Sequence, residues 1–284
     1  MVNNNSKNEI KVALKMYCDR LGSQNAAANS LDNVSSATIS QILKGNWELI
    51  SDEMWMSVQA QVMKRKKGWV IAETSVYKKI YAHLNDMKLN PKGIRGIIIN
   101  ASMGKSISVE SFSENNPNTY YIRCHRQMSI RLLFRTMLKT MGKDNSGTTM
   151  EMLDNIIHYL ERDNQPLFII DEVDKLKDEV LEIFIDLENE LHGKCGFAWL
   201  GTPYLQRRIY SGVGRNKRGF AELYSRLRKT FWDFTPTRKE FAKDVAIISK
   251  ANGVDDENVI LEMANKCEGD FRVLGDLIET YKKL

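Results

Sequence analysis

The spacing of apolar residues divides the chain into three parts: helices alone, then strands alternating with helices, then helices alone. Near the start, apolar residues recur at helical spacing over residues 10–21, and Gly22 provides a natural stop. Two shorter helices follow, with Ser23 and Ser35 as their N-cap residues. The pattern therefore predicts a small all-α unit over residues 1–66.

Short apolar runs in the middle part predict the strands of a buried sheet. The runs lie at residues 96–99, 119–124, 167–170, 196–200 and 231–234. Helical periodicity is found at 76–87, 129–141, 149–163 and 180–191, and again after Pro236 at 238–251, 257–267 and 272–283. Strands separated by helices form parallel sheets with helices on their faces. The expected fold class is therefore α/β, with a parallel sheet flanked by helices and a helical C-terminal part.

Composition narrows the class of protein. Of the 284 residues, 27% are charged and 43% hydrophobic, as in soluble globular proteins. The apolar runs are too short to cross a membrane and no secretory leader opens the sequence, so a cytoplasmic protein without membrane partners is expected. The cysteines and histidines show no pairing and no metal-ligand spacing, which argues against a disulfide framework and a zinc site. The cysteines are Cys18, Cys124, Cys195 and Cys267.

Candidate chemistry begins directly after the first strand run. Gly104, Lys105 and Ser106 match the end of the phosphate-binding pattern G-x-x-x-x-G-K-[ST], but Ile99 stands in place of its first glycine. In this pattern backbone amides at a helix start bind phosphates, the lysine reaches the β- and γ-phosphates, and the serine helps to hold Mg²⁺. The expected cofactor-binding residues are Asn100, Ala101, Ser102, Met103, Gly104, Lys105 and Ser106.

A second signal lies at the end of the run at 167–170, where Asp171 and Glu172 follow the apolar residues. A carboxylate at the carboxyl end of a parallel strand can join the Mg²⁺ shell, and its neighbour can orient and deprotonate the attacking water. Thr202 follows the next run, at a strand tip where a polar side chain can reach the γ-phosphate or that water. An acidic helix cap would explain Asp171 and Glu172 alone, but it would not predict the phosphate loop upstream.

Two arginines complete an ordered series of features. Arg226 ends a basic helical stretch just before the run at 231–234, and Arg272 opens the last helical stretch, within the sequence GDFR. The features follow one another along the chain in a fixed order. The order is a phosphate loop, an Asp-Glu strand, a polar strand tip, an arginine at a helix end and an arginine in a helical C-terminal part. This order resembles the AAA+ ATPases, and among them the transposition regulators of the MuB, TnsC and IstB type.

The resemblance covers most of the chain and implies a role for each residue. Lys105 and Ser106 correspond to the Walker A pair, Asp171 and Glu172 to the Walker B pair, Thr202 to sensor 1, Arg226 to the arginine finger and Arg272 to sensor 2. It implies ATP and Mg²⁺ as cofactors, with Ser106 and Asp171 at the metal. It also implies three domains: a helix-turn-helix over 1–66, an AAA+ core over 67–235 and a helical lid over 236–284.

Residues 23–47, SQNAAANSLDNVSSATISQILKGNW, resemble a lambda-repressor-like helix-turn-helix. Asn33 suits the turn because asparagine tolerates a left-handed conformation. In this resemblance the second helix lies in the major groove and directs Ser36, Gln41 and Lys44 toward DNA. A helical interaction module that does not contact DNA is the alternative. A helix-turn-helix ahead of the ATPase points most to MuB within the family.

Part of the net charge of +5 is concentrated in QRRIYSGVGRNKRGF, residues 206–220. Basic residues surround glycines there, which predicts a flexible loop that contacts DNA phosphates without reading bases. The residues expected to do so are Arg207, Arg208, Arg215, Lys217 and Arg218. A mobile, solvated loop is the alternative.

These features together favour an ATP-dependent protein that assembles on duplex DNA as a ring or filament, largely independently of sequence. It would select transposition target sites, stimulate a partner transposase and hydrolyse ATP. A replication initiator or helicase loader shares the same ATPase domain and is one alternative. A non-enzymatic DNA-binding regulator with a decayed ATPase site is another; Ile99 favours it, while Asp171, Glu172 and the two arginines oppose it.

Overall fold

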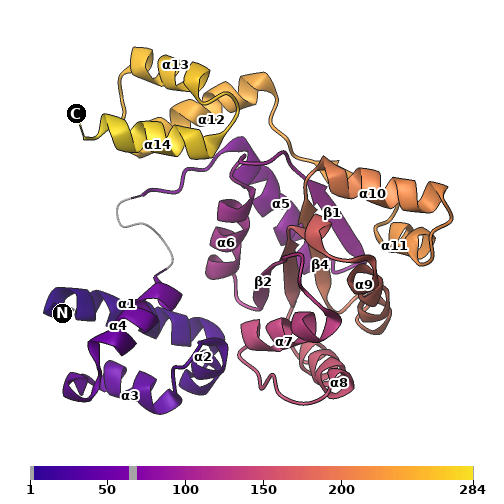
Figure 1. The fold of residues 1–284 in the computed structure, drawn as a ribbon, viewed down its shortest axis with the longest axis horizontal. Helices are drawn as coiled ribbons and strands as arrows, with labels where there is room; N and C mark the ends of the chain where they lie inside the picture. The colour runs from indigo at the N-terminus through magenta and orange to yellow at the C-terminus, as the bar shows by residue number, and fades with distance from the viewer. Residues whose placement is uncertain (1–2, 64–68, 284) are drawn as a thin grey trace. The chain divides into compact units, whose positions relative to one another are not determined.

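The computed structural model of the chain describes residues 3–63 and 69–283 (Figure 1). Contacts divide the chain into two units, one comprising Met1–Lys67 with Arg131–His158 and the other Gly68–Ile130 with Tyr159–Leu284. The domain boundary expected between residues 66 and 67 lies outside the described residues.

The first unit begins with helices α1 (Asn4–Leu21), α2 (Gln24–Ser30), α3 (Ser36–Lys44) and α4 (Asp52–Val62), with a 3-10 turn η1 (Trp47–Leu49) ahead of α4. Ser23 and Ser35 cap α2 and α3 as predicted, because their hydroxyl oxygens accept the backbone N–H groups of Ala26 and Thr38. Asn33 between the two helices has a φ of 58°, the left-handed conformation expected there.

The N-terminal helices share one core, in which Ile10, Leu14 and Trp55 are fully buried. On α3, the helical i, i+4 spacing favours Ile39 and Leu43 as the inward-facing pair. Ile39 is fully buried, but Ile42 rather than Leu43 takes the second buried position, and Leu43 packs at the edge of the core. The remaining part of this unit carries α7 (Ile130–Thr140) and α8 (Thr149–Leu160), both close to the predicted helices.

The second unit is built on a five-stranded parallel sheet in the order β2-β3-β4-β1-β5 (Figure 1). The strands are β1 (Ile94–Ile98), β2 (Thr119–Arg123), β3 (Leu167–Asp171), β4 (Gly196–Gly201) and β5 (Phe231–Asp233). All four neighbouring pairs are parallel. The predicted α/β fold with helix-flanked parallel strands is therefore confirmed.

Helices cover the sheet because side chains along each strand alternate between its faces. On one face, Ile169 and its neighbours pack with α5 (Ser75–Leu89) and α6 (Lys105–Asn115). On the other face, Phe197 and Trp199 contact the edge of the Phe184 ring on α9 (Asp178–Glu190), with centroids 5.9 and 5.2 Å away. Both layers were signalled by apolar stripes in the sequence.

The prediction of a flexible loop over residues 206–220 is wrong for its first part. Helix α10 (Pro203–Gly214) runs through it and is followed by α11 (Phe220–Arg226). Gly212 is buried, and a Cβ added there would lie 2.0 Å from the ring of Phe220. This glycine therefore permits close approach of the two helices rather than flexibility. The apolar pair Leu205 and Ile209, fully buried on α10, is the helical signal in this stretch.

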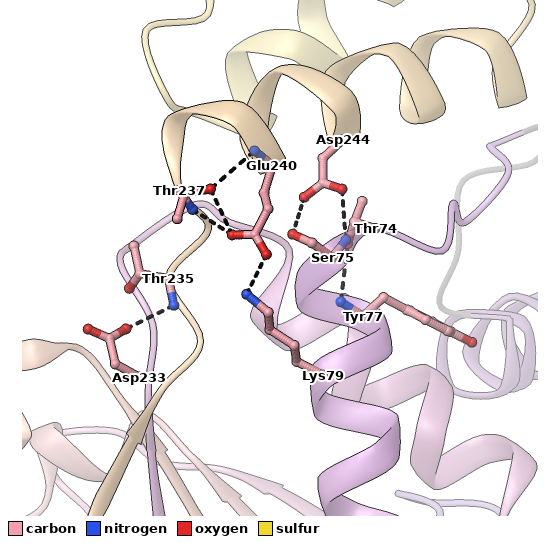
Figure 2. Close-up of polar contacts among 9 residues, drawn as sticks. All are labelled: Thr74, Ser75, Tyr77, Lys79, Asp233, Thr235, Thr237, Glu240 and Asp244. Atoms are coloured by element: carbon pink, nitrogen blue, oxygen red, sulfur yellow. Dashed lines mark hydrogen bonds and ion pairs between the residues drawn. The ribbon is translucent and has the colours of Figure 1, made fainter.

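The C-terminal helices α12 (Arg238–Ala251), α13 (Glu257–Lys266) and α14 (Phe271–Tyr281) have a small core of their own. Polar contacts join them to α5 (Figure 2). The buried carboxylate of Asp244 accepts the N–H of Ser75 at 2.7 Å and its hydroxyl at 2.5 Å, and Lys79 pairs with Glu240 at 2.8 Å. These bonds tie α12, the first of the three helices, to the first half of α5.

Neither a disulfide nor a membrane-spanning helix is found among the described residues. The four cysteines are all buried and free. No described helix combines the length and apolar character needed to cross a bilayer.

Candidate functional site

The turn between β1 and α6 contains two residues in the left-handed conformation. Ile99 extends the strand: its N–H donates to the carbonyl of Gly201 at 3.1 Å, and its side chain is fully buried. The left-handed conformations fall later in the turn, at Ser102 with a φ of 61° and at Gly104 with a φ of 78°. The missing first glycine therefore stands at a position where a side chain belongs to the core.

Helix α6 begins at Lys105 and presents its first backbone N–H groups to this turn. Gly104 at its N-cap provides no side-chain acceptor, and the first turn of α6 carries no acidic residue. The amides at a helix start and the positive end of the helix dipole favour an anion. The turn and helix together therefore form a site suited to a phosphate group.

Asp171 at the end of β3 is fully buried, and four groups converge on its carboxylate. Ser106 donates its hydroxyl to Oδ2 at 2.7 Å, and the ammonium nitrogen of Lys105 lies 3.4 Å from Oδ1. Tyr121 donates its hydroxyl to Oδ2 at 3.2 Å, and the N–H of Glu172 donates to Oδ1 at 2.8 Å. A buried carboxylate needs such partners. The structure thus brings together the residues that the sequence assigned to phosphate and metal binding.

Tyr121 was missed from the sequence. Its burial, together with the charge of Asp171, raises the pKa of the Tyr121 hydroxyl, so the group remains a donor. The pairing register of β2 with β3, which the structure supplies, explains why Tyr121 lies at this site. Tyr121 pairs with Ile169, and Arg123, two residues later, pairs with Asp171. Alternate polar residues at the end of β2 thus lie beside the acidic end of β3.

Glu172 follows Asp171 in a left-handed conformation, with a φ of 58°. Arg123 contacts its carboxylate at 3.0 Å and Lys175 at 2.5 Å, and neither cation was identified from the sequence. Burial acts to raise the pKa of Glu172, but the hydrogen bonds from Arg123 and Lys175 outweigh it and lower that pKa to about 2. The carboxylate is therefore ionised and engaged by two cations.

The oxygen donors at this site fit Mg²⁺. Hard divalent cations take carboxylate, hydroxyl and phosphate oxygens, and Mg²⁺ commonly keeps waters and binds through only one or two carboxylates. Asp171 and Ser106, which are hydrogen-bonded to each other, would supply one carboxylate and one hydroxyl oxygen to the metal. Among the described residues there is no group of three or more His, Cys, Asp or Glu side chains that could hold a metal by itself. Nucleotide phosphates would have to complete the coordination.

Thr202 lies at the same edge of the sheet. It directly follows β4, which is placed between β3 and β1, and the carboxyl ends of parallel strands share one edge. Its hydroxyl donates to Asp174 at 3.1 Å, in the 3-10 turn η2 (Val173–Lys175). Thr202, the polar residue predicted at a strand tip, is thus hydrogen-bonded to the turn that directly follows Glu172.

The C-terminal helices reach the phosphate loop. The N–H of Phe271 donates to the carbonyl of Ser102 at 3.0 Å, and its ring stacks on Phe241 with centroids 5.1 Å apart. Arg272 is the next residue and is exposed, and its N–H donates to Asp270. A role of Arg272 at a bound nucleotide would require its side chain to turn toward the loop.

Arg226 has a different environment. Its Nε lies 3.1 Å from the buried carboxylate of Glu188 on α9, and its guanidinium also contacts Asn189 and Glu222. The structure does not bring Arg226 to the phosphate loop of its own chain. A role at a nucleotide would therefore require the site of a neighbouring subunit.

The residues expected to contact DNA fall into two groups. On α3, Lys44 is exposed, whereas Ser36 and Gln41 are half-buried. In the second unit, four of the five basic residues line one pocket of about 520 Å³: Arg207, Arg208, Arg215 and Lys217. The fifth, Arg218, is exposed and follows Lys217 directly.

Residues 97–209 match the model of a family described as AAA domain. None of the curated proteins with which the sequence was compared matches it. Among solved structures, the chain is similar to the crystal structure of Cdc6p from Pyrobaculum aerophilum, at 13% identity and a TM-score of 0.47, over 66% of this chain and 52% of that one. The chain thus spans about half the length of that protein. Residues 97–209, from β1 into α10, therefore form an AAA-type domain.

Proposed function

We propose that this protein binds ATP with Mg²⁺ and hydrolyses it to ADP and phosphate. The observation that carries the proposal is the convergence of Lys105 and Ser106 on the buried carboxylate of Asp171, beside the open N-terminus of α6. A structural ion pair would need neither a left-handed glycine turn nor an uncapped helix start. A phosphate bound at a helix start makes use of both.

The residues of the chain divide the work of phosphoryl transfer. Lys105 and the amides of the loop would neutralise the β- and γ-phosphates, while Ser106 and Asp171 would hold the metal, whose positive charge would offset that of the phosphates. Glu172 orients a water for in-line attack on the γ-phosphorus and accepts its proton as the bond to ADP breaks. Thr202, at the tip of β4, would fix the same water.

Glu172 must exchange partners before it can act as the base. Arg123 and Lys175 hold its carboxylate, and a pKa of about 2 makes it a poor proton acceptor. Release from at least one cation restores its basicity. Hydrolysis is therefore slow in the isolated chain and faster in an assembly that moves Arg123.

We further propose that the protein assembles on duplex DNA as a homo-oligomeric ring or filament, selects transposition targets and stimulates a transposase. The capped helices α2 and α3, with exposed Lys44, and the basic pocket on α10 support a DNA partner. Arg272 would sense the nucleotide from the lid, and Arg226 would act on a neighbour's nucleotide. Capture of a helicase, in place of a transposase, from the native host would favour an initiator or helicase loader.

An ATPase assay with and without duplex DNA tests the enzymatic proposal. Lys105→Ala removes the cation at the phosphates and should abolish ATP binding. Glu172→Gln should bind ATP normally, hydrolyse it poorly and remain assembled on DNA. Wild-type turnover by Glu172→Gln would remove Glu172 from the role of base. Absence of ATP binding by the wild-type chain would favour the decayed, non-enzymatic regulator.

A further inference from the structure

One face of α10 is almost entirely basic and polar. Residues 204, 207, 208, 211 and 215 follow the i, i+3, i+4, i+7 and i+11 spacing that puts side chains on one side of a helix. They are Tyr204, Arg207, Arg208, Ser211 and Arg215, and with Lys217 they line the pocket of about 520 Å³. Tyr204, Arg207 and Arg215 are exposed to solvent.

A single carboxylate lies in this pocket. Of the described residues that line it, Asp178 alone is acidic, and it pairs with both Arg208 and Lys217. Burial acts to raise the pKa of Asp178, but the hydrogen bonds from Lys217 and Arg208 lower it, so the carboxylate remains charged. Because the pocket holds Arg207 and Arg215 as well, its net charge is positive.

The pocket is a formed feature rather than a mobile loop. The N–H of Lys217 donates to the carbonyl of Gly212 at 2.9 Å, and the N–H of Arg215 donates to that of Ser211 at 3.1 Å. The ring of Phe220 packs directly on Gly212, and the ammonium of Lys217 lies 5.2 Å from the centre of the same ring. Cations held in place before binding lose less conformational entropy when a ligand arrives.

We propose that this pocket binds the phosphodiester backbone of DNA, and that Asp178 occupies the place of the phosphate in the free protein. The inference rests on the proposed binding of duplex DNA and identifies where the backbone sits and what it displaces. A carboxylate and a phosphate are both anions that accept paired N–H donors from arginine, so one can replace the other. Arg208 and Lys217 would then pass from Asp178 to the phosphate, with Arg207 and Arg215 at its outer side.

Asp178 therefore acts as an internal competitor of DNA. Without its charge, Arg208 and Lys217 would be available to the backbone without first leaving a partner. Exposed and half-exposed ion pairs contribute little each, so Asp178→Asn should tighten binding roughly two- to tenfold. The slope of log K against log salt should steepen by about one unit for each additional phosphate that the protein neutralises. Because bases are not read, both effects should be equal for unrelated sequences.

The test is an anisotropy titration of the full chain with two unrelated duplexes across a range of salt concentrations. Asp186→Asn is the matched control, because it removes the same charge from an exposed position on the same helix, α9. Tighter binding and a steeper slope for Asp178→Asn, but not for Asp186→Asn, are the expected result. In the double variant Asp178→Asn with Lys217→Ala, much of the increase in affinity should disappear.

Other results overturn the inference. If wild type binds DNA and Asp178→Asn matches Asp186→Asn in affinity and slope, DNA does not displace Asp178, while the proposed function stands. If Asp178→Asn has a lower melting temperature than wild type, the double variant Arg207→Ala, Arg215→Ala provides the test instead. An unchanged salt slope in that double variant would mean that the DNA backbone binds elsewhere. Altered ATP turnover without DNA in Asp178→Asn would overturn the inference and connect the pocket to the nucleotide site, since Arg208 also donates to the carbonyl of Asp174, the residue that Thr202 contacts. A wild-type chain that binds neither duplex refutes the DNA proposal as a whole.

Discussion

At the scale of single residues, the sequence identified the groups that follow one another along the chain and missed those that meet across strands. Lys105, Ser106 and Asp171 converge because a motif and a strand end place them at one edge of a parallel sheet. Tyr121 and Arg123 reach Asp171 and Glu172 from β2. Their contribution depends on the register between β2 and β3, which no local pattern in β2 encodes.

The pair formed by Arg123 and Glu172 predicts an increase in activity. Arg123→Ala removes one of the two cations that hold the carboxylate, so the pKa of Glu172 should rise and the group should become a better base. We expect ATP turnover without DNA to increase several-fold and stimulation by DNA to diminish. Arg126→Ala is the control, because it removes an arginine from an exposed position in the same segment between β2 and α7. Lower turnover in Arg123→Ala alone would show that Arg123 supports catalysis instead, and unchanged turnover would show that Arg123 does not restrain Glu172.

The same pKa makes a prediction about stability. The pKa of Glu172 is lowered from an ordinary value of 4.5 to about 2, so its ion pairs stabilise the folded state above pH 4.5 and are lost as pH falls toward 2. Glu172→Gln should therefore melt below wild type at pH 6, and the difference should shrink steadily down to pH 3. Thermal melts of both proteins measure it. A gap in melting temperature that is independent of pH would mean that shape, not charge, is lost at this position.

At the scale of elements, apolar periodicity predicted the strands and most helices, but the glycines of α10 led to the prediction of a loop. Glycine is compatible both with flexibility and with close packing, and sequence alone does not separate the two. The structure does: Gly212 faces the ring of Phe220, whereas nothing lies within 4 Å of a Cβ added at Gly214.

The two glycines therefore make a matched pair for measurement. Gly212→Ala places a methyl group against the Phe220 ring and should destabilise the fold by about 1–3 kcal/mol, as overpacking does. Gly214→Ala meets no obstacle at the end of α10 and should leave the melting temperature unchanged or raise it slightly. Equal melting temperatures for the two variants in the same buffer would mean that α10 and α11 do not pack as described.

At the scale of the whole molecule, the alternation of strands and helices was enough to predict the α/β class, yet it left the reach of the C-terminal helices open. Phe271 touches the phosphate loop, and Asp244 and Glu240 hold the same helices to α5 (Figure 2). Asp244 and Ser75 are 169 positions apart, and a contact over such a separation is beyond any local pattern. In the structure, Arg226 lies against Glu188 of α9 and not at the phosphate loop of its own chain.

If Arg226 serves a neighbour's nucleotide, complementary defects should compensate. Arg226→Ala should bind ATP as a single subunit but lose DNA-stimulated hydrolysis and assembly, since a planar guanidinium at the γ-phosphate contributes about 10³ to 10⁵ in turnover in related systems. Lys105→Ala keeps the arginine and loses the nucleotide. A mixture of the two should pair intact pockets with intact fingers and recover part of the ATPase activity.

The ion pair between Arg226 and Glu188 makes a control for stability necessary in this experiment. It is buried and pairs with Arg226, so Arg226→Ala leaves a buried carboxylate without that cation and lowers stability on its own account. Arg226→Lys keeps a positive charge near Glu188 but lacks the planar fork, so it should fold like wild type and still need Lys105→Ala subunits for turnover. Recovery of activity in both mixtures, with a wild-type melting temperature for Arg226→Lys, assigns the loss to catalysis between subunits. No recovery at any mixing ratio, or normal assembly by Arg226→Lys alone, would leave Arg226 as the partner of Glu188 and nothing more.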